Sequence, residues 1–359
     1  MRDIYYLDHA ATFYPTKFFA KDYYVSGNPN SPYALGLQAN QALNEARQRI
    51  MNCLGVRSGK VIVGGTASQL VDNLMWRIRR VHRIGQHATF CSIYEHDCLH
   101  RWADVVIEEI PTDGIYQGDV VCWMMTNNIT GTIFPVEQIG KTCRDAGAYY
   151  IMDAVATVGH YPISNDLESF CDCLITSAHK YGGPQGTGCM WVSDRFAKFL
   201  ELSDDSHEEY GLIHGTPNVS AAVAMSYAMK HAVENATSNW VEHRTLVNKM
   251  LFDLQDEAIE TRIVCDESLP KAYSINALYL PLFNSDALVR YLSSKSIYIS
   301  PGHSACSNDD ADASRVLEAF GLTKQQASQT VRVSFGESTS QEDINALVNG
   351  IVEFKNLFI

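Results

Sequence analysis

Several apolar runs of the chain end in residue types that bind phosphate or do acid–base chemistry. The run "CDCLITSAHK" ends in Ser177, His179 and Lys180, and the glycine-rich "YGGPQGTG" follows it directly. Two further runs, "GDVVCWMMTNN" and "AYYIMDAVA", carry Asn128 and Asp153 at or near their ends. Each run is long and apolar enough to form a buried strand, so we expect these polar residues at strand ends.

A turn of small residues, "GGTAS" (64–68), follows the apolar run "KVIV" and precedes a helical pattern. The first backbone N–H groups of a helix have no partner inside the helix, and the helix dipole is positive at that end. Thr66 and Ala67 therefore stand where a phosphate could bind. Taken alone, the turn is equally well explained as a structural glycine turn.

Apolar runs alternate with amphipathic stretches along the chain, a pattern that predicts an α/β fold with a mostly parallel sheet. In an open sheet of this kind, the carboxyl ends of the strands border one crevice. We therefore expect Thr66, Asn128, Asp153 and Lys180 to converge there. Residues 218–255 contain no proline and predict one long helix, or two abutting helices, that leads from a large domain into a smaller C-terminal one.

A phosphate cradle, a carboxylate and a lysine in one crevice fit pyridoxal phosphate. Its aldehyde forms a Schiff base with a lysine, its ring nitrogen pairs with a carboxylate, and its phosphate takes N–H and hydroxyl donors. Lys180, Asp153 and the pair Thr66 with Ser177 fit these three roles. A dinucleotide-binding fingerprint in "YGGPQGTG" is disfavoured, because Pro184 interrupts it and no helical pattern follows.

Nine short motifs resemble, in order and spacing, those of the cysteine desulfurases of the class V aminotransferase family, in its long-loop group. They are "YLDHAAT" (6–12), "GGTAS" (64–68), "EHD" (95–97), "NNITGTIFP" (127–135), "DAVATVG" (153–159), "SAHKYGGPQGTG" (177–188), "GTPNV" (215–219), "SACS" (304–307) and "VRVSFGEST" (331–339). The resemblance implies the pyridoxal-phosphate fold type I, which is aspartate-aminotransferase-like, with a mostly parallel sheet in a large domain and a smaller α+β domain. It implies a cofactor-binding large domain at 15–235, and a small domain with the cysteine loop at 1–14 and 236–359.

The resemblance also implies a role for individual residues. Lys180 would form the Schiff base, and Cys306 would be the nucleophile. Arg332, with Asn128 nearby, would clamp the substrate carboxylate, a task that suits a planar guanidinium. The other implied cofactor contacts are His96 stacked on the ring, Asp153 at the ring nitrogen, Asn128 beside the ring hydroxyl, Thr66, Ser177 and His179 at the phosphate with Ala67 in the same turn, and Thr216 from the other subunit of a homodimer.

The function implied is the conversion of L-cysteine to L-alanine, with a persulfide on Cys306 that passes to a sulfur acceptor protein. The destination could be iron–sulfur assembly, tRNA thiolation or DNA phosphorothioation. In this reaction Lys180 would take the Cα proton and His96 would handle the proton of the substrate thiol. The segment around Cys306, polar and acidic up to the helical "SRVLEAFGL" (314–322), is expected to be a long mobile loop.

Two alternatives of different kinds remain open. A selenocysteine lyase or small-amino-acid aminotransferase of the same fold would not need Cys306 for turnover. A catalytically weak sulfur-carrier scaffold is the other, because the chain departs from the family at several positions. Ala156 replaces a glutamine that contacts the ring oxygen, and Tyr210 and Ile213 replace arginines before "GTPNV".

Without the resemblance, two of the site residues have simpler interpretations. Arg332 alternates with valines in "TVRVSFG", which predicts an outward-facing, solvated charge on a strand. His96 would be interpreted as a hydrogen-bonded histidine of the core.

Charge and cysteine usage exclude several classes of protein. The formal net charge is −13, from 28 basic and 41 acidic residues, which disfavours direct binding to nucleic acid. No signal-peptide pattern and no membrane-spanning apolar run is found, so a cytoplasmic protein is expected. The ten cysteines include no C-x-x-C pair, and Cys171 with Cys173 are expected in the core of a strand, with no metal site.

Overall fold

The computed structural model describes residues 4–81, 87–110, 113–205, 208–302 and 310–358. Its internal contacts divide the chain into two compact units. The larger unit comprises residues 15–125 and 135–235, and the smaller unit comprises residues 1–14, 126–134 and 236–359.

This division differs from the expected domains, 15–235 against 1–14 with 236–359, at residues 126–134. The physical reason is that this segment bonds to the smaller unit. Thr132 forms an isolated bridge with Lys271, and the Lys271 ammonium donates to the carbonyl of Thr130. Arg332 donates to the carbonyl of Asn128 at 3.1 Å.

The larger unit is built on a seven-stranded sheet in the order β2-β8-β7-β6-β5-β3-β4. The strands are β2 (Lys60–Gly64), β3 (Thr89–Ser92), β4 (Val105–Ile107), β5 (Val120–Cys122), β6 (Tyr149–Asp153), β7 (Cys173–Ser177) and β8 (Gly188–Val192). Strands β3 to β7 pair in parallel, whereas β8 runs antiparallel to both of its neighbours. The central strands are buried along their whole length, which is why the sequence shows them as continuous apolar runs.

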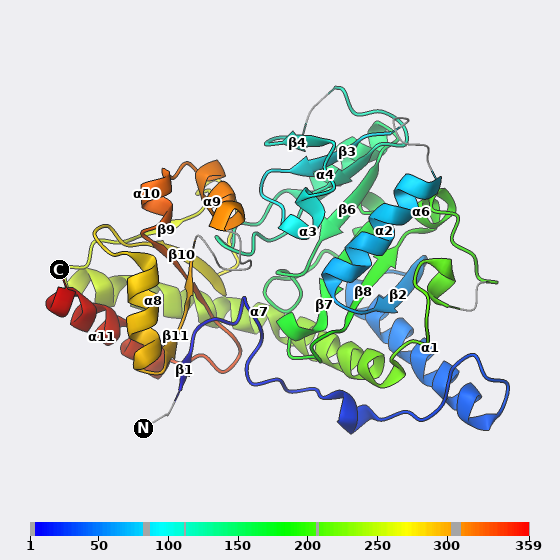
Figure 1. Ribbon diagram of the computed structural model, residues 1–359, viewed down its shortest axis with the longest axis horizontal. Coiled ribbons are helices and arrows are strands. Elements are labelled where there is room, and N and C mark those ends of the chain that lie inside the picture. Colours follow the sequence, from blue (N-terminus) through cyan, green and yellow to red (C-terminus); the bar gives the residue numbers. More distant parts are fainter. Residues whose placement is uncertain (1–3, 82–86, 111–112, 206–207, 303–309, 359) are drawn as a thin grey trace. The chain divides into compact units, whose positions relative to one another are not determined.

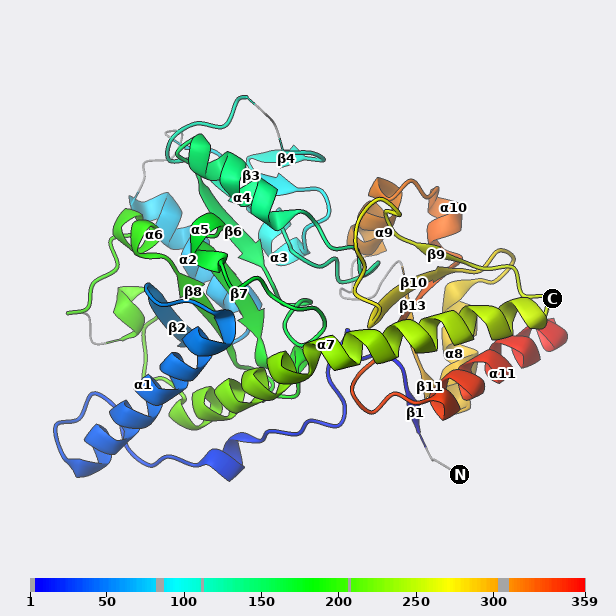
Figure 2. The same ribbon diagram turned by 180° about the vertical axis from the view of Figure 1, so that it is seen from behind.

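Helices cover both faces of this sheet. Figure 1 shows α2 (Ala67–Val81) across one face, and Figure 2, the view from behind, shows α4 (Val136–Asp145) and the first half of α7 (Val219–Asp256) over the other. The remaining helices of the larger unit are η1 (Ala20–Tyr23), α1 (Ala34–Leu54), α3 (Asp97–His100), α5 (Leu167–Phe170), η2 (Ala178–Lys180), α6 (Asp194–Phe199) and η3 (Glu209–Gly211). The core on the α2 side joins Leu70, Leu74 and Ile78 of that helix to strand residues such as Ile151 and Ile175.

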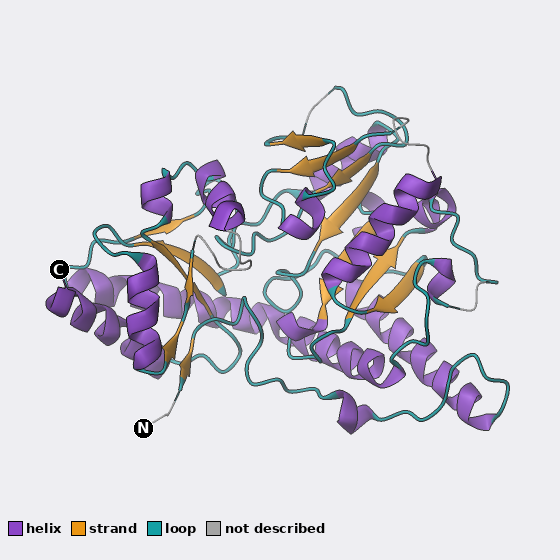
Figure 3. Ribbon diagram, viewed as in Figure 1, coloured by secondary structure: helices purple, strands orange, loops and turns teal. Residues whose placement is uncertain are grey.

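The smaller unit combines strands and helices, as the colouring of Figure 3 shows. Its strands are β1 (Tyr5–Tyr6), β9 (Arg262–Val264), β10 (Ile275–Tyr279), β11 (Ile297–Tyr298), β12 (Ser300–Pro301) and β13 (Thr330–Ser334). They form an antiparallel sheet in the order β12-β13-β10-β9 and a parallel pair β1-β11. Its helices are α8 (Ser285–Ser294), α9 (Asp310–Ala319), α10 (Lys324–Ala327) and α11 (Gln341–Phe358).

Both faces of the four-stranded sheet are covered, because successive side chains along its strands point to opposite faces and contact different helices. Val331 and Val333 of β13 join one cluster with α7, α8 and α11. Ala277 of β10 joins a second cluster with Leu317 of α9 and Ala327 of α10. Both faces of this sheet are therefore buried.

Three sequence predictions about local structure can be compared with these elements. The long helix predicted over 218–255 is α7, one continuous helix. Helix α9 begins at Asp310, four residues before the predicted helical start at Ser314. Cys171 and Cys173 are fully buried, and the nine described cysteines, none of them in a disulfide, include seven buried ones. Within the described part of the chain, every helix is too short or too polar to cross a bilayer.

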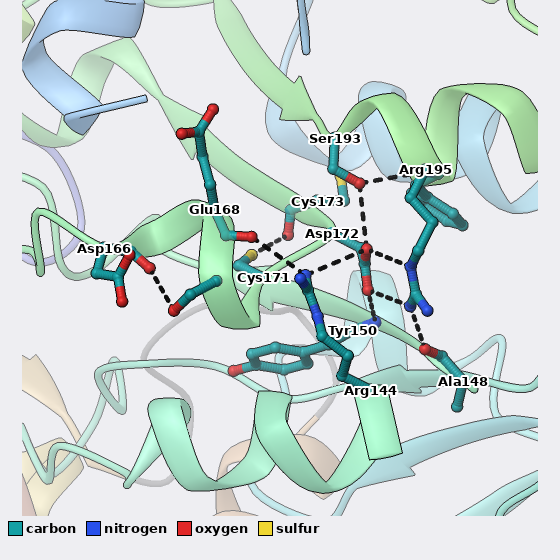
Figure 4. A network of polar contacts seen from close by, with 12 residues as sticks. Arg144, Ala148, Tyr150, Asp166, Glu168, Cys171, Asp172, Cys173, Ser193 and Arg195 are labelled. Carbon is teal, nitrogen blue, oxygen red and sulfur yellow. Dashed lines mark hydrogen bonds and ion pairs between the residues drawn. The ribbon is translucent and has the colours of Figure 1, made fainter. Parts of the chain in front are cut away.

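A buried carboxylate, Asp172, lies just before β7 and hydrogen-bonds to residues at the start of β6 and just after β8 (Figure 4). It accepts two hydrogen bonds from Arg195, at 3.1 and 2.8 Å, and one from the hydroxyl of Ser193 at 3.1 Å. The backbone N–H of Tyr150 donates to it at 3.1 Å, and Arg144 lies 3.9 Å away. The negative charge is thus buried with its partners in place.

We expect Asp172→Ala to lower the free energy of unfolding by about 3 kcal/mol, since removing one side of a buried pair leaves the remaining donors without an acceptor. Urea unfolding followed by circular dichroism measures this loss. The matched control is Glu353→Gln, which breaks an ion pair to Lys295 whose two side chains are 49% and 44% exposed and should leave the unfolding midpoint nearly unchanged. Equal midpoints for the two variants would contradict the assignment.

Candidate active site

The register of β2, β8 and β7 brings the small-residue turn and the lysine turn to the same end of the large sheet, where β2 and β7 have their last residues. Gly64, the last residue of β2, pairs with Gly188, and Gly188 pairs with Ser177, the last residue of β7. Asp153 ends the next strand, β6, where it pairs with Ile175 of β7. The residues that follow β2, β6 and β7 therefore begin at the same edge.

The turn after β2 leads directly into the start of helix α2. Thr66 and Gln69 cap α2 reciprocally: the Gln69 N–H donates to the Thr66 hydroxyl at 3.3 Å, and the Thr66 N–H donates to the Gln69 amide oxygen at 3.1 Å. A Cβ on Gly65 would stand 1.9 Å from that amide oxygen, so a side chain there would have to displace the Gln69 amide from its capping position. Ala67 is the first residue of α2, at its positive end. The turn suits an anion.

Lys180 lies in a three-residue turn, η2, directly after β7. Its backbone is fixed by Ala178, which donates to the Thr187 carbonyl at 2.9 Å and accepts from Tyr181 at 3.1 Å and Gly183 at 2.9 Å. Ser177 is buried, while Lys180 is partly exposed. The lysine side chain thus projects from a fixed backbone at the strand edge.

Asp153 is surrounded by groups that oppose one another electrostatically. Burial raises the pKa of its carboxyl group, while the N–H of Val155 at 2.8 Å, His96 and Lys180 each lower it, and the net pKa is raised. Because His96 and Lys180 both act on this carboxyl, the structure brings the three side chains into one site. A cation placed against Asp153 would favour its charged form.

His96 caps the short helix α3, and its Nδ1 accepts a hydrogen bond from the N–H of Cys98 at 3.1 Å. In the neutral ring the proton is therefore on Nε2, which can donate. His179 is neutral near pH 7, because burial first and the charge of Lys180 second lower its pKa to about 4. The site thus holds a neutral imidazole next to the lysine.

Arg332 is fully buried, and the prediction of a solvated charge from its alternation with valines is wrong. Val331 and Val333 point to one face of β13, and Arg332 points to the other. Arg332 is paired with Ala277 of β10, which lies on the face of the sheet that α9 and α10 cover. Its guanidinium forms an ion pair with Asp8 at 3.0 Å and donates to the Ser300 hydroxyl at 3.4 Å and to the Asn128 carbonyl at 3.1 Å. Arg332 and Asn128 therefore meet within the smaller unit.

The predicted site residues are distributed between the two units. Those of the larger unit are Thr66, Ala67, His96, Asp153, Ser177, His179, Lys180 and Thr216. Thr216 is exposed, with the side-chain amide of Asn28 3.5 Å from its hydroxyl. Asn128 and Arg332 belong to the smaller unit. Cys306 lies outside the described residues.

Sequence reasoning missed two acidic residues of these sites. Glu95 is fully buried, and its pKa is raised well above the usual range, by burial first and by the nearby charge of Asp153 second. Asp8, the partner of Arg332, is the other. Both stand inside motifs, "EHD" and "YLDHAAT", that were available as signals.

Comparison with known proteins identifies the family. The sequence pattern described as Aminotransferase class-V matches residues 107–347, more than half of the chain. The chain belongs to the class-V aminotransferase family. Among curated members similar to it, cysteine desulfurase IscS of Clostridium botulinum is 26% identical over 95% of this chain and 91% of its own. Cysteine desulfurase IscS of Methanosarcina thermophila is 28% identical over 91% of this chain and 84% of its own.

Solved structures show the same fold for this class-V member. A NifS-like protein superposes with a TM-score of 0.84 at 22% identity, covering 99% of this chain and 100% of that one. A NifS-like protein from Rickettsia africae superposes with a TM-score of 0.82 at 20% identity, covering 99% and 100%. The predicted fold, type I with a mostly parallel sheet and a smaller α+β part, is confirmed. Among the residues that the structure describes, no group of three or more His, Cys, Asp or Glu could hold a metal ion.

The partly buried imidazole of His179, with its lowered pKa, predicts a pH-dependent stability. Its folded-state pKa, about 4, lies below the ordinary value of 6.5, so the unfolded chain binds the extra proton between these values. The free energy of unfolding of the wild type, minus that of His179→Gln, should therefore rise from pH 4 to pH 6.5 and stay level above it. Urea titrations at half-unit pH steps measure this difference. A difference that does not change with pH would contradict the lowered pKa of His179.

Proposed function

We propose that this chain is a pyridoxal-phosphate-dependent cysteine desulfurase that converts L-cysteine to L-alanine and stores the sulfur as a persulfide on Cys306. The observation that carries the proposal is the pairing of Gly64 with Gly188 and of Gly188 with Ser177. Through this pairing the start of helix α2 and the turn with Lys180 begin at the same end of the sheet, where β6 also ends at Asp153. Family membership and relatives named cysteine desulfurase support it.

The described residues fit the cofactor group by group. The start of α2, with Thr66, and the buried hydroxyl of Ser177 would hold the phosphate, and Asp153 would pair with the ring nitrogen. The raised pKa of Asp153 is consistent with a carboxylate that awaits a cationic partner. When bound through Lys180, pyridoxal phosphate supplies an electron sink for the Cα carbanion of the substrate. His96 would stack on the ring, and Asn128 would lie beside its hydroxyl.

Side chains of the protein would then carry out the proton transfers and hold the substrate. The Lys180 amine, once free, would take the Cα proton of cysteine and give a proton back to Cα when alanine is released. His96, with its Nδ1 held by the Cys98 N–H, carries its hydrogen on Nε2 and would donate it toward the substrate sulfur. Arg332 binds the substrate carboxylate, and its ion pair with Asp8 and bond to the Asn128 carbonyl keep its fork oriented.

Cys306 receives the sulfur in this proposal. Its thiolate would attack the sulfur of the bound substrate, and the C–S bond would break with its electron pair left on the carbon side. Cβ would then take up a proton to become the methyl group of alanine, and the enzyme would be left with a persulfide. The sulfur then passes to an acceptor protein, for iron–sulfur assembly, tRNA thiolation or DNA phosphorothioation.

Two departures from the family pattern have structural roles in the larger unit. Ile213 packs beneath the phosphate turn, where a Cβ on Gly64 would stand 2.7 Å from its Cδ1. The ring of Tyr210 contacts two cations, Lys60 at 4.7 Å and Arg47 at 5.4 Å from the ring centre. Ile213 therefore packs against the end of β2, and Tyr210 against cations at the start of β2 and in α1.

A second copy of the chain would complete the site as a homodimer. Large apolar side chains are exposed on one continuous stretch of sequence in the larger unit: Phe19, Tyr24, Tyr33, Leu35 and Leu37, at 44 to 75% exposure. Apolar surface of this kind is typical of an interface with another protein. The exposed hydroxyl of Thr216 would then be available to the phosphate bound by the partner.

Lys180→Ala should abolish covalent attachment of pyridoxal phosphate and lower alanine release about 1,000-fold or more, since both the attachment point and the general base are lost. Visible absorbance of the purified protein and a coupled alanine assay measure the two effects. Lys198→Ala, which alters an exposed lysine of the same unit, serves as the control and should retain both. Alanine release by Lys180→Ala at the wild-type rate would refute the assignment.

Incubation with cysteine should add one sulfur to the peptide that contains Cys306, and Cys306→Ser should lose both this adduct and sulfur transfer. Mass spectrometry of the digested protein detects the adduct. The matched control is Cys265→Ser, because Cys265 is partly exposed and burial raises its pKa. Alanine release that is unaffected in Cys306→Ser would instead support a selenocysteine lyase or aminotransferase.

A further inference from the structure

The imidazole of His160 contacts the backbone of the lysine turn. His160 is 6% exposed, and its Nε2 lies 3.2 Å from the carbonyl oxygen of Lys180. A carbonyl only accepts hydrogen bonds, so Nε2 must carry the hydrogen of this contact.

The position of His160 is itself tightly fixed. Its N–H donates to the Thr157 carbonyl at 2.9 Å, and Gly159 before it adopts a left-handed conformation with φ of 80°. A Cβ on Gly159 would approach the Cβ of Ala232, in helix α7, to 2.7 Å. The turn therefore packs closely against helix α7.

The lysine turn is so short that the backbone N–H groups following it donate to the first carbonyl of the turn, that of Ala178, and not to the last, that of Lys180. Helix η2 has three residues, and the hydrogen bonds from Tyr181 and Gly183 both go to the carbonyl of Ala178. The Lys180 carbonyl instead receives the Nε2 hydrogen of His160. An imidazole from a separate, anchored turn thus fixes the peptide group from which the lysine side chain departs.

We propose that His160 is a positioning residue for Lys180, acting through the Lys180 carbonyl. The inference rests on the proposed function, in which Lys180 alternates between a bond to the cofactor and a free base. The lysine amine is joined to the backbone by four flexible methylene groups, so its position depends on a fixed starting point. Misplacement of a reacting group by about 1 Å can lower a rate about 100-fold.

Three variants separate the hydrogen bond from the bulk of the ring. His160→Leu removes the donor, His160→Gln places an amide N–H near the position of Nε2, and His160→Asn has an amide that is one methylene too short. Apoprotein is mixed with pyridoxal phosphate, the linkage is trapped with borohydride at timed intervals, and the Lys180 peptide is quantified by mass spectrometry. We expect His160→Leu and His160→Asn to label about 10- to 100-fold more slowly than wild type. His160→Gln should label within about threefold of wild type.

Steady-state kinetics of the loaded variants give a second readout. The kcat of His160→Leu should fall by a similar factor, with little change in KM for cysteine, because Arg332 is untouched. His160→Gln should restore kcat, a rescue that a general loss of stability would not produce.

A matched control is available in the smaller unit. His243 is 3% exposed, and its Nε2 lies 3.1 Å from the carbonyl of Gly336. His243→Leu should lower thermal stability as His160→Leu does but leave the labelling rate of Lys180 unchanged. The proposal is overturned if His160→Leu labels at the wild-type rate, or if His243→Leu slows labelling equally. No labelling of Lys180 in wild type would overturn the proposed function itself, so the two failures are distinct.

Discussion

The candidate site depends on the backbone pairing of β2, β8 and β7. Because Gly64 and Ser177 both pair with Gly188, strands β2 and β7 end level with each other. The start of helix α2 and the turn with Lys180 therefore begin at the same end of the sheet. Glycine at the central position allows this close approach, because a Cβ on Gly188 would stand 2.8 Å from the Thr176 carbonyl. A slip of one residue would turn Ser177 to the other face of the sheet.

Electrostatics around this edge follow from burial. The raised pKa of Asp153 and Glu95 and the lowered pKa of His179 all have desolvation as their largest cause. Each shift disfavours charge on an isolated group, so the site is poised to receive a ligand that supplies charge of its own. A cofactor with a cationic ring nitrogen and an anionic phosphate does this. The smaller unit instead pairs its charges within itself, as Arg332 and Asp8 show.

Strand ends were predictable from the sequence, because apolar runs that are buried on both faces end where the chain turns polar. Lys180, Asp153 and the turn at Thr66 could be placed in this way. The burial of Arg332 could not, since alternation along a strand does not reveal that helices from distant sequence cover the second face. The grouping of residues 126–134 with the smaller unit and the contact of His160 with Lys180 both depend on pairings across long sequence separations, which local patterns do not encode.

The reversed direction of β8 affects how the site assembles as the chain folds. Strands β7 and β8 are antiparallel neighbours, so the chain returns to the sheet edge at Gly188 only eight residues after Lys180. A loop this short closes at a low entropic cost, whereas Thr66 precedes Lys180 by more than a hundred residues. Local contacts form faster than distant ones. The lysine turn can therefore fold as part of a hairpin, before the distant segment that carries the anion-binding helix start joins the sheet.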